Sequence, residues 1–142
     1  MRLSLICPLL CVLLASACAT VPEGAGGDLC KQAGGSSQLQ AELLFGRDTN
    51  GRGPVSDAER AGFMADVVTP RFPAGLTTWD TRGQWRDAAT GKTIQEDSFV
   101  IRIVAAATPE TLARLAQIRS AYVSQFHQDA VGLLLTSICA SF

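Results

Sequence analysis

The sequence predicts an α+β domain in which a four-stranded antiparallel sheet carries two helices on one face. Three observations support this prediction. Several short segments alternate apolar and polar residues, as half-buried strands do, and two longer segments combine a helix-capping signal with apolar residues at helical spacing. These segments follow one another as strand, helix, strand, strand, helix, strand. With 142 residues, 47% of them hydrophobic, the chain can form one such core.

The first seventeen residues have the features of an export signal. Arg2 gives a positive start, an apolar run extends from Leu3 to Leu14, and small residues precede Cys18. The run is too short to span a bilayer, which needs about 20 apolar residues. The stretch "LLASAC" resembles the lipobox of bacterial lipoproteins, which implies that Cys18 is lipidated and becomes the mature N-terminus. The same small residues suit ordinary signal peptidase, so a soluble secreted form is the alternative.

The resemblance also indicates a location. Ala19 follows the anchor in place of an aspartate, which implies the outer membrane, facing the periplasm, in a cell that has one. Residues 18–37 are rich in Gly, Ser and Ala and show no apolar periodicity, so we expect a lipid anchor and a flexible tether. Residues 38–142 then form the single domain.

Charge and cysteine content narrow the classes of partner. Removal of residues 1–17 takes away one of the 12 basic residues and none of the 13 acidic ones, which leaves a net charge of −2. Such a surface has no basic field for nucleic acid, so we expect the membrane as a partner through the lipid anchor alone. Cys30 and Cys139 are the thiols that remain beside Cys18, and an oxidising compartment favours a disulfide between them.

The first half of the domain contains a strand and a helix. Apolar and polar residues alternate from Leu39 to Phe45, which indicates a half-buried strand. Ser56 and Glu59 form a capping box, so a helix should begin there. This helix should end near Thr69, because the residue before a proline is pushed out of the helical region.

The second half continues with a hairpin, a helix and a strand. Strands are expected over residues 76–85, with a bulge at Gly83, and 99–105, joined by a turn at "ATGK". Thr108 caps a second helix, whose buried stripe is predicted to contain Leu112, Leu115, Ile118, Tyr122 and Phe126. The apolar segment "VGLLLTSIC" near the C-terminus predicts a last strand that is buried on much of both faces.

This order of elements matches the ferredoxin-like split βαβ plan, with both helices on one face. In that topology the last strand lies antiparallel to the first, at the sheet edge. The end of the last strand therefore meets the beginning of the first, which brings Cys139 close to Cys30. A disulfide between them is predicted on this ground as well.

Three patterns that suggest chemistry have simpler explanations. The loop "DTNGRGPVSDAE" partly matches a calcium-binding EF-hand loop, but Arg52 occupies a ligand position and would repel the ion. His127 and Asp129 suggest half of a catalytic dyad, but no nucleophile motif accompanies them, and a histidine at a helix C-terminus interacts favourably with the helix dipole. No His/Cys spacing suits zinc. We therefore expect no metal and no cofactor.

The densest stretch, "VVTPRFPAGLTTWDTRGQW" at residues 67–85, carries a family resemblance. Together with "ELLFGRD", "VSDAERAGFMADV" and "IQEDSFVIRIV" it resembles the bacterial family called domain of unknown function 3574, whose members are small secreted proteins and often lipoproteins. The resemblance runs from about Glu42 to Val131. It departs at Arg60, where tryptophan is usual, and at Gln95, where we expect arginine. It implies a compact α+β domain and supplies no established activity.

The same stretch contains the candidate ligand-binding residues. The predicted hairpin could bring together a polar and aromatic set that grips a carboxylate, a sugar or a peptide: Arg71, Asp80, Gln84, Trp85, Arg86 and Glu96. The alternative is structural, with an ion pair between Arg71 and Asp80 that fixes the corner between helix and strand. We favour the structural role.

The sheet face away from the helices is a candidate interface. If residues 99, 101 and 103 face the helices, the opposite face carries Leu44, Val100, Arg102 and Val104. Apolar patches of this kind mark an interface or a ligand groove. A homodimer, another envelope protein or the tether would cover it. The sequence therefore predicts an envelope lipoprotein that acts as a non-enzymatic binding or interaction module; the alternative is a periplasmic enzyme that acts on a small polar substrate at the Arg/Asp/Trp/Glu set.

Overall fold

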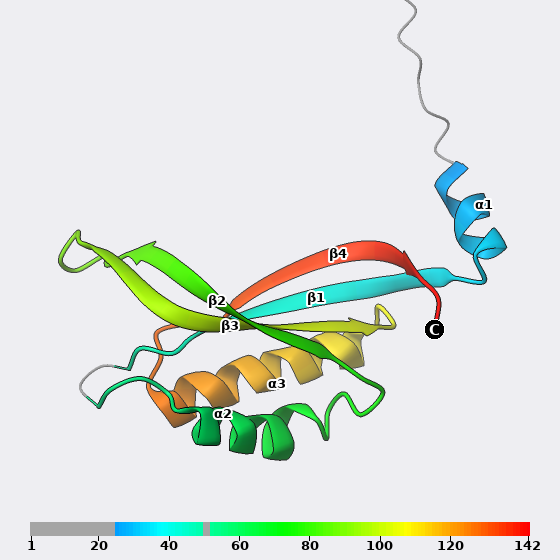
Figure 1. Ribbon diagram of the computed structural model, residues 1–142. Helices are drawn as coiled ribbons and strands as arrows, with labels where there is room; N and C mark the ends of the chain where they lie inside the picture. Colours follow the sequence, from blue (N-terminus) through cyan, green and yellow to red (C-terminus); the bar gives the residue numbers. More distant parts are fainter. Residues whose placement is uncertain (1–24, 50–51) are drawn as a thin grey trace, which may run out of the picture.

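The computed structural model describes residues 25–49 and 52–142, and its elements follow the predicted order with one addition at the N-terminus (Figure 1). The helical elements are α1 (Ala25–Gln32), α2 (Asp57–Phe63), the π-helical turn η1 (Met64–Val68) and α3 (Pro109–Phe126). The strands are β1 (Ser36–Gly46), β2 (Thr77–Arg86), β3 (Thr93–Ala105) and β4 (Gly132–Ala140). The predicted export signal and Cys18 lie outside the described residues.

The four strands form one antiparallel sheet in the order β2-β3-β1-β4, which is the predicted ferredoxin-like arrangement. Helices α2 and α3 cover one face, and the other face carries no helix (Figure 1). Leu43 of β1 pairs with Ile101 of β3 on one side and Leu133 of β4 on the other. Leu43 and Ile101 are fully buried beneath the helices, so the predicted fold class and the predicted helix-facing residues are confirmed.

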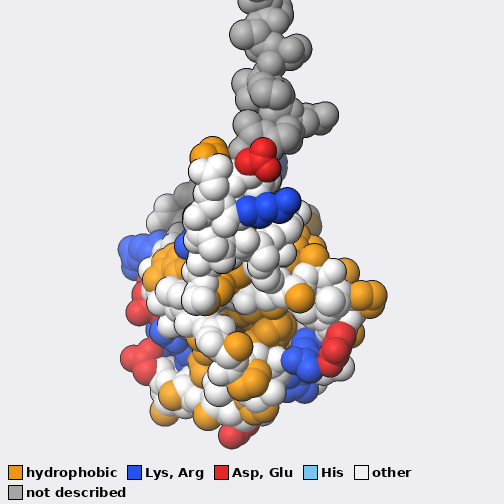
Figure 2. All heavy atoms as spheres, turned by 90° about the vertical axis from the view of Figure 1, so that its right-hand side faces the viewer, with side chains coloured by type: hydrophobic (Ala, Val, Ile, Leu, Met, Phe, Trp, Pro, Cys, Tyr) orange, Lys and Arg blue, Asp and Glu red, His pale blue; other side chains and the backbone are white. Residues whose placement is uncertain are grey.

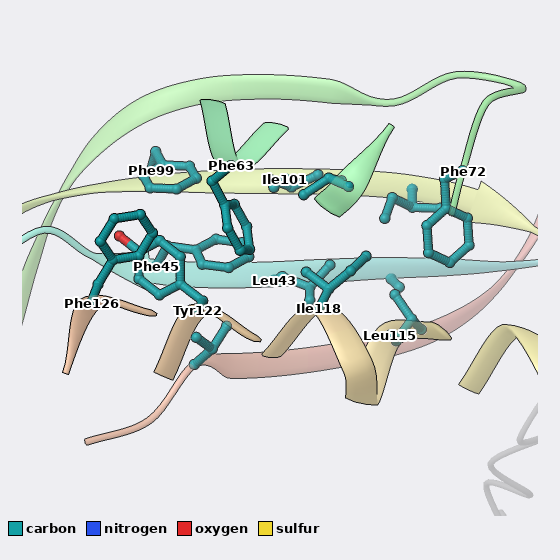
Figure 3. Packing of buried hydrophobic residues seen from close by; sticks show 14 of the residues in the cluster. Leu43, Phe45, Phe63, Phe72, Phe99, Ile101, Leu115, Ile118, Tyr122 and Phe126 are labelled. Atoms are coloured by element: carbon teal, nitrogen blue, oxygen red, sulfur yellow. The ribbon is translucent and has the colours of Figure 1, made fainter. Parts of the chain in front are cut away.

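Tyr122 of α3 lies at the centre of an aromatic core (Figure 3). Its ring centroid is 4.7 Å from that of Phe45, 5.1 Å from that of Phe63 and 4.7 Å from that of Phe126. Its hydroxyl donates a 2.8 Å hydrogen bond to the carbonyl oxygen of Gly46. Burial raises the pKa of the Tyr122 hydroxyl far above its usual value, so the hydroxyl stays a donor. This bond fixes α3 to the end of β1.

The capping box at the start of α2 is confirmed. The Ser56 hydroxyl accepts a hydrogen bond from the Glu59 amide at 3.3 Å, and the Glu59 carboxylate accepts one from the Ser56 amide at 2.8 Å. The Ser56 amide, with the Arg52 guanidinium, lowers the pKa of Glu59 to about 2. The helix ends in one π turn, in which the Thr69 amide donates to the Met64 carbonyl, immediately before Pro70.

β4 differs from the prediction of a strand buried on both faces. It is an edge strand, and Leu134 and Leu135, which point to opposite faces, are 51% and 46% exposed. The edge position itself was predicted correctly from the topology, but the apolar run was interpreted as burial, although an edge strand has a neighbouring strand on one side alone. Leu112, predicted on the buried stripe of α3, lies in the first turn of that helix and is also largely exposed.

The hairpin of β2 and β3 is longer and more regular than predicted. β3 begins at Thr93, and its pairing with β2 continues without a bulge through Gly83, which lies opposite Glu96. A Cβ atom at position 83 would lie 3.2 Å from Oγ of Ser98. Glycine at this position therefore reflects the close approach of Ser98, and the predicted bulge is wrong.

The N-terminal end of the domain is more ordered than the predicted tether. Residues 25–32 form α1, and β1 already begins at Ser36. The predicted disulfide between Cys30 and Cys139 is present, with an S–S distance of 2.05 Å, and fixes α1 to the end of β4. Figure 2 shows hydrophobic side chains gathered below α1, with charged side chains at both flanks. The segment lacks apolar periodicity, so we attribute its position to this covalent bond.

Candidate functional site

A cavity of about 810 Å³ opens on the sheet face that carries no helix. Three adjacent strands form its floor, with Leu44 from β1, Thr81 and Gly83 from β2, and Ser98 and Val100 from β3. Its walls come from the loop after β1 (Asp48, Thr49, Gly53 and Pro54), from the loop before β4 (residues 127–130) and from Trp85 and Ile94 on the hairpin.

The shape of the β2–β3 hairpin creates this hollow. Its distal end bends away from the helix layer in Figure 1, so that Trp85 and Ile94 rise beside the sheet face. At Gly83 the floor lacks a side chain, and the side chain of Ser98 lies close to this position. The end of β1 and the start of β4 are neighbours in the sheet, and this topology brings the loops at these ends together as the opposite wall.

The carboxylate of Glu96 has a defined position in the cavity. Its carboxylate lies over Gly46, where a Cβ atom would be only 2.5 Å from Oε2 of Glu96. The backbone amide of Asp48 donates a 3.2 Å hydrogen bond to the same oxygen. Burial raises the pKa of Glu96, and the nearby charge of Asp48 adds to this effect, whereas hydrogen bonds from the Asp48 amide and the Trp85 side chain act in the opposite direction. Gly46 thus makes room for a carboxylate held partly out of water.

Trp85 and Trp79 lie on the same sheet face but have different surroundings. The ring of Trp79 is covered by the guanidinium of Arg102, 4.9 Å from the ring centroid, and Arg102 also pairs with Glu42 at 2.6 Å. Trp85 is 41% exposed and lines the cavity. It lies diagonally across the ladder from Glu96, since Gly83 is the direct partner of that residue. Trp85 therefore presents an open indole face next to a carboxylate.

The six residues proposed from sequence do not form one cluster. Arg71 lies in the helix layer, where it donates to the carbonyl of Val67 at 2.7 Å and to the side chain of Gln117 at 3.1 Å. Asp80 is on the helix side of β2 and pairs with Arg60, so the ion pair between Arg71 and Asp80 is not formed.

The other four proposed residues lie along the hairpin. Arg86 donates to the carbonyl of Gly91 at 3.2 Å, near the hairpin turn. Trp85 and Glu96 line the cavity with their side chains. Gln84 borders it through its position in β2, but its side chain is on the other face, where it accepts a hydrogen bond from Gln95 at 3.1 Å. The cavity adds Asp48, His127 and Asp129, which the sequence suggested only as parts of an EF-hand-like loop and of a catalytic dyad.

The predicted neighbouring of β1 and β4 could have indicated Asp48, His127 and Asp129 as cavity residues. His127 ends α3 in the left-handed conformation, with φ of 54°, and the next residue, Gln128, donates a side-chain hydrogen bond to the carbonyl of Asp48. The two loops are joined through this contact. Since β1 and β4 were predicted as neighbours, the meeting of the loops at their adjoining ends could have been inferred from the sequence.

The four candidate interface residues lie on the helix-free face, as predicted from their alternation. Leu44 is 41% exposed, but Val100 is only 6% exposed on the cavity floor. Arg102 forms its ion pair with Glu42 in the middle of this face, and Val104 is half-buried. The face is therefore mixed rather than uniformly apolar.

No helix within residues 25–49 and 52–142 has the length and apolarity of a membrane span. Within these same ranges, no three His, Cys, Asp or Glu side chains are grouped as ligands for a metal ion. Positions 50 and 51 of the EF-hand-like loop lie outside the described residues.

Comparison with known proteins gives a family and a fold. The model of a family described as "protein of unknown function (DUF3574)" matches residues 40–142. No curated protein matches the sequence at a significant level. Among solved structures, a phage SAM lyase in complex with S-methyl-5′-thioadenosine is similar, with a TM-score of 0.58 and 14% identity over 72% of this chain and 90% of the other.

Two further solved structures are similar. The apo form of a phage SAM lyase has a TM-score of 0.53 and 16% identity over 77% of this chain and 93% of the other. The GlnK–ATP complex of B. subtilis has a TM-score of 0.43 and 12% identity over 72% and 82%. At these identities the first two similarities concern the fold alone.

Proposed function

This chain belongs to the DUF3574 family, and from the geometry of its cavity we propose that it is a non-enzymatic binding module for a small organic molecule. One observation carries the proposal: a hollow of about 810 Å³ in which an exposed indole, Trp85, lies beside a partly buried carboxylate, Glu96. Ligand sites in proteins are concavities of about 300–1,000 Å³, lined mainly by apolar groups with a few oriented polar ones. The cavity has this size and composition.

The enzyme alternative required Arg71 and Asp80 to lie next to Trp85 and Glu96. Arg71 and Asp80 have partners in the helix layer, so they do not contribute to the cavity. The remaining polar groups are suited to orienting a ligand. Binding is therefore the function that this geometry supports best.

Binding is tested by titrating the mature protein with four probes: 2-phenylethylammonium, 2-phenylethanol, 3-phenylpropanoate and S-methyl-5′-thioadenosine, the ligand of the similar phage enzyme. We expect at least one probe to shift the NMR signal of the Trp85 indole N–H saturably. The Trp79 signal should move little, because Arg102 covers that ring.

Trp85→Ala is expected to weaken the binding of that probe about 10-fold or more, because the aromatic contact is lost. The matched control is Leu134→Ala, which removes another exposed apolar side chain from the same sheet face outside the cavity. Its affinity should equal that of the wild type. If no probe shifts Trp85, or if both variants bind equally well, the cavity is not the binding site.

We also propose that the protein is exported and anchored through Cys18 in the cell envelope, in the outer membrane facing the periplasm. The lipobox-like "LLASAC" supports this, and so does the disulfide, which requires an oxidising compartment. α1, through which the chain enters the domain, lies at the opposite end from the β2–β3 turn in Figure 1. An anchor before α1 would therefore leave the cavity facing away from the membrane.

Cys18→Ala is expected to move the protein from the membrane pellet to the soluble fraction, because the acyl chains that hold it would be missing. Cell fractionation and incorporation of labelled fatty acid measure this change. Cys139→Ala is the matched control and should leave the protein in the pellet. A wild-type protein found in the soluble fraction would refute the anchor.

The helix-free face remains our proposed surface for a second copy or another envelope protein. Leu44 and Leu134 are 41% and 51% exposed there, but the Arg102–Glu42 ion pair interrupts the apolar area. Because its apolar area is interrupted, this surface supports a proposal of partner binding less strongly than the cavity supports one of ligand binding. The molecular mass of the mature protein in solution shows whether it self-associates.

A further inference from the structure

We infer that the cavity is specific for organic cations, namely ammonium compounds with a flat or apolar body, with Glu96 and Trp85 as the groups that hold the cationic head. This inference rests on the proposed function and adds the chemical class of the ligand. Four observations carry it: the charge balance of the cavity, the fixed orientation of Glu96, the open face of Trp85, and a second site on the same sheet that already holds a cation with the same two kinds of group.

The cavity has an excess of negative charge. Three carboxylates line it, those of Asp48, Glu96 and Asp129. None of the three forms an ion pair within residues 25–49 and 52–142. Arg82 also lines the cavity, but its guanidinium lies 3.2 Å from the carboxylate of Asp97, which offsets its charge. An anionic ligand would meet uncompensated negative charge here, whereas a cation would balance it.

The Glu96 carboxylate is oriented before any ligand arrives. The Asp48 amide holds one of its oxygens, and Gly46 leaves the space in which the group lies. Since a hydrogen bond between ionised groups gains most when its geometry is fixed and water is partly excluded, this carboxylate is a suitable acceptor for an ammonium N–H.

Trp85 supplies the complementary surface. An ammonium group is attracted to the face of an indole ring, and an apolar or aromatic body stacks on the same ring. The floor beneath is apolar, with Leu44 and Val100. A ligand with a cationic head and an apolar body therefore satisfies both the polar and the apolar parts of the cavity.

The same sheet face contains an internal template for this recognition. There the guanidinium of Arg102 lies 4.9 Å from the ring centroid of Trp79 and 2.6 Å from the carboxylate of Glu42. A cation is thus held between an indole and a carboxylate. Six residues further along β2, Trp85 lies beside Glu96 of β3 and contributes a hydrogen bond to its carboxylate. Within residues 25–49 and 52–142, no side chain forms an ion pair with Glu96 and no cationic group lies over the ring of Trp85. We infer that the ligand supplies this missing cation.

Binding should depend on pH through Glu96. Burial raises the pKa of this carboxyl group, and only its ionised form attracts a cation. Affinity for a cation should therefore rise as the pH increases through the raised pKa of Glu96 and then level off. The ionisable and charged groups around this carboxylate are those of Arg47, Asp48, Arg82, Tyr122, His127 and Asp129.

Isothermal titration of the mature protein with three probes of similar size tests the inference. At pH 7.5 we expect 2-phenylethylammonium to bind about 10-fold or more tightly than 2-phenylethanol, because only the ammonium group adds charge–charge attraction to its hydrogen bond with the Glu96 carboxylate. The anion 3-phenylpropanoate should bind more weakly than either.

Glu96→Gln should remove the preference for the cation, lowering its affinity about 10-fold, and should lower the affinity for 2-phenylethanol much less, because the amide oxygen of glutamine still accepts a hydrogen bond from the hydroxyl group. It should also abolish the rise of affinity with pH. Asp66→Asn is the matched control, since it removes one exposed negative charge from the helix layer and should change none of these values. An unchanged circular dichroism spectrum and melting temperature of the Glu96 variant would show that the variant folds.

The outcomes separate this inference from the proposed function. Equal or tighter binding of the alcohol or the anion would overturn the cation specificity and leave the binding module intact. A cation preference that survives Glu96→Gln would overturn the role of this carboxylate. Failure of all three probes to bind would overturn the cation specificity, and the binding module would also be overturned if S-methyl-5′-thioadenosine left the Trp85 signal unchanged.

Discussion

Tyr122→Ala is expected to lower the free energy of unfolding by about 3–5 kcal/mol, the range found when a buried aromatic residue is truncated. Tyr122 is fully buried and packs against Phe45, Phe63 and Phe126 from three different elements. Removing its ring leaves a cavity that rigid strands on one side cannot fill. The loss should appear as a lower urea midpoint with an unchanged m-value.

Tyr122→Phe is the matched control for this change. It keeps the ring and removes only the hydroxyl that donates to the Gly46 carbonyl at 2.8 Å, so it should cost about 1 kcal/mol. If the alanine and phenylalanine variants lost the same stability, the aromatic packing would not be the main support of the core.

Loss of the disulfide is the second large effect. The bond joins Cys30 and Cys139, which are 109 residues apart in sequence, and closing a loop of this length stabilises the fold by about 4–5 kcal/mol in the chain-entropy model. We expect the double variant Cys30→Ser/Cys139→Ser to unfold at a lower urea concentration and temperature than the oxidised wild type. Urea denaturation and calorimetry measure this difference.

Reduction provides the control for the disulfide. A reducing agent should lower the midpoint of the wild type to that of the double variant and should leave the double variant unchanged. The stabilising role of the bond is contradicted if the oxidised and reduced wild-type proteins unfold at the same midpoint.

Much of the fold could be predicted because the signals were local and mutually consistent. Alternation in residues 39–45 indicates the first strand, the Ser56 capping box and the proline after Thr69 mark the two ends of one helix, and the order of the elements fixes the topology. That topology also correctly placed Cys30 beside Cys139. The exposure of β4 was missed because its apolar residues were interpreted as a sign of burial, although the same topology placed this strand at the sheet edge.

The candidate site was predicted only in part, for two physical reasons. Asp80 and Trp85 are close in sequence, but strand side chains alternate between faces, so an even and an odd position of β2 point to opposite sides. The bend of the β2–β3 hairpin depends on how the whole sheet folds, so no local residue pattern predicted it. Two features could have been inferred from the predicted topology. Trp85 and Gly83 are two residues apart in one strand and so share a face, and the loop after β1 meets the loop before β4.

The central claim is that an organic cation binds between Trp85 and Glu96, and a crystal structure of the mature protein grown with 2-phenylethylammonium tests it most directly. The account predicts the ammonium nitrogen about 3 Å from a carboxylate oxygen of Glu96, with the phenyl ring against the indole of Trp85. An empty cavity at saturating probe, or a probe bound elsewhere on the molecule, would contradict it.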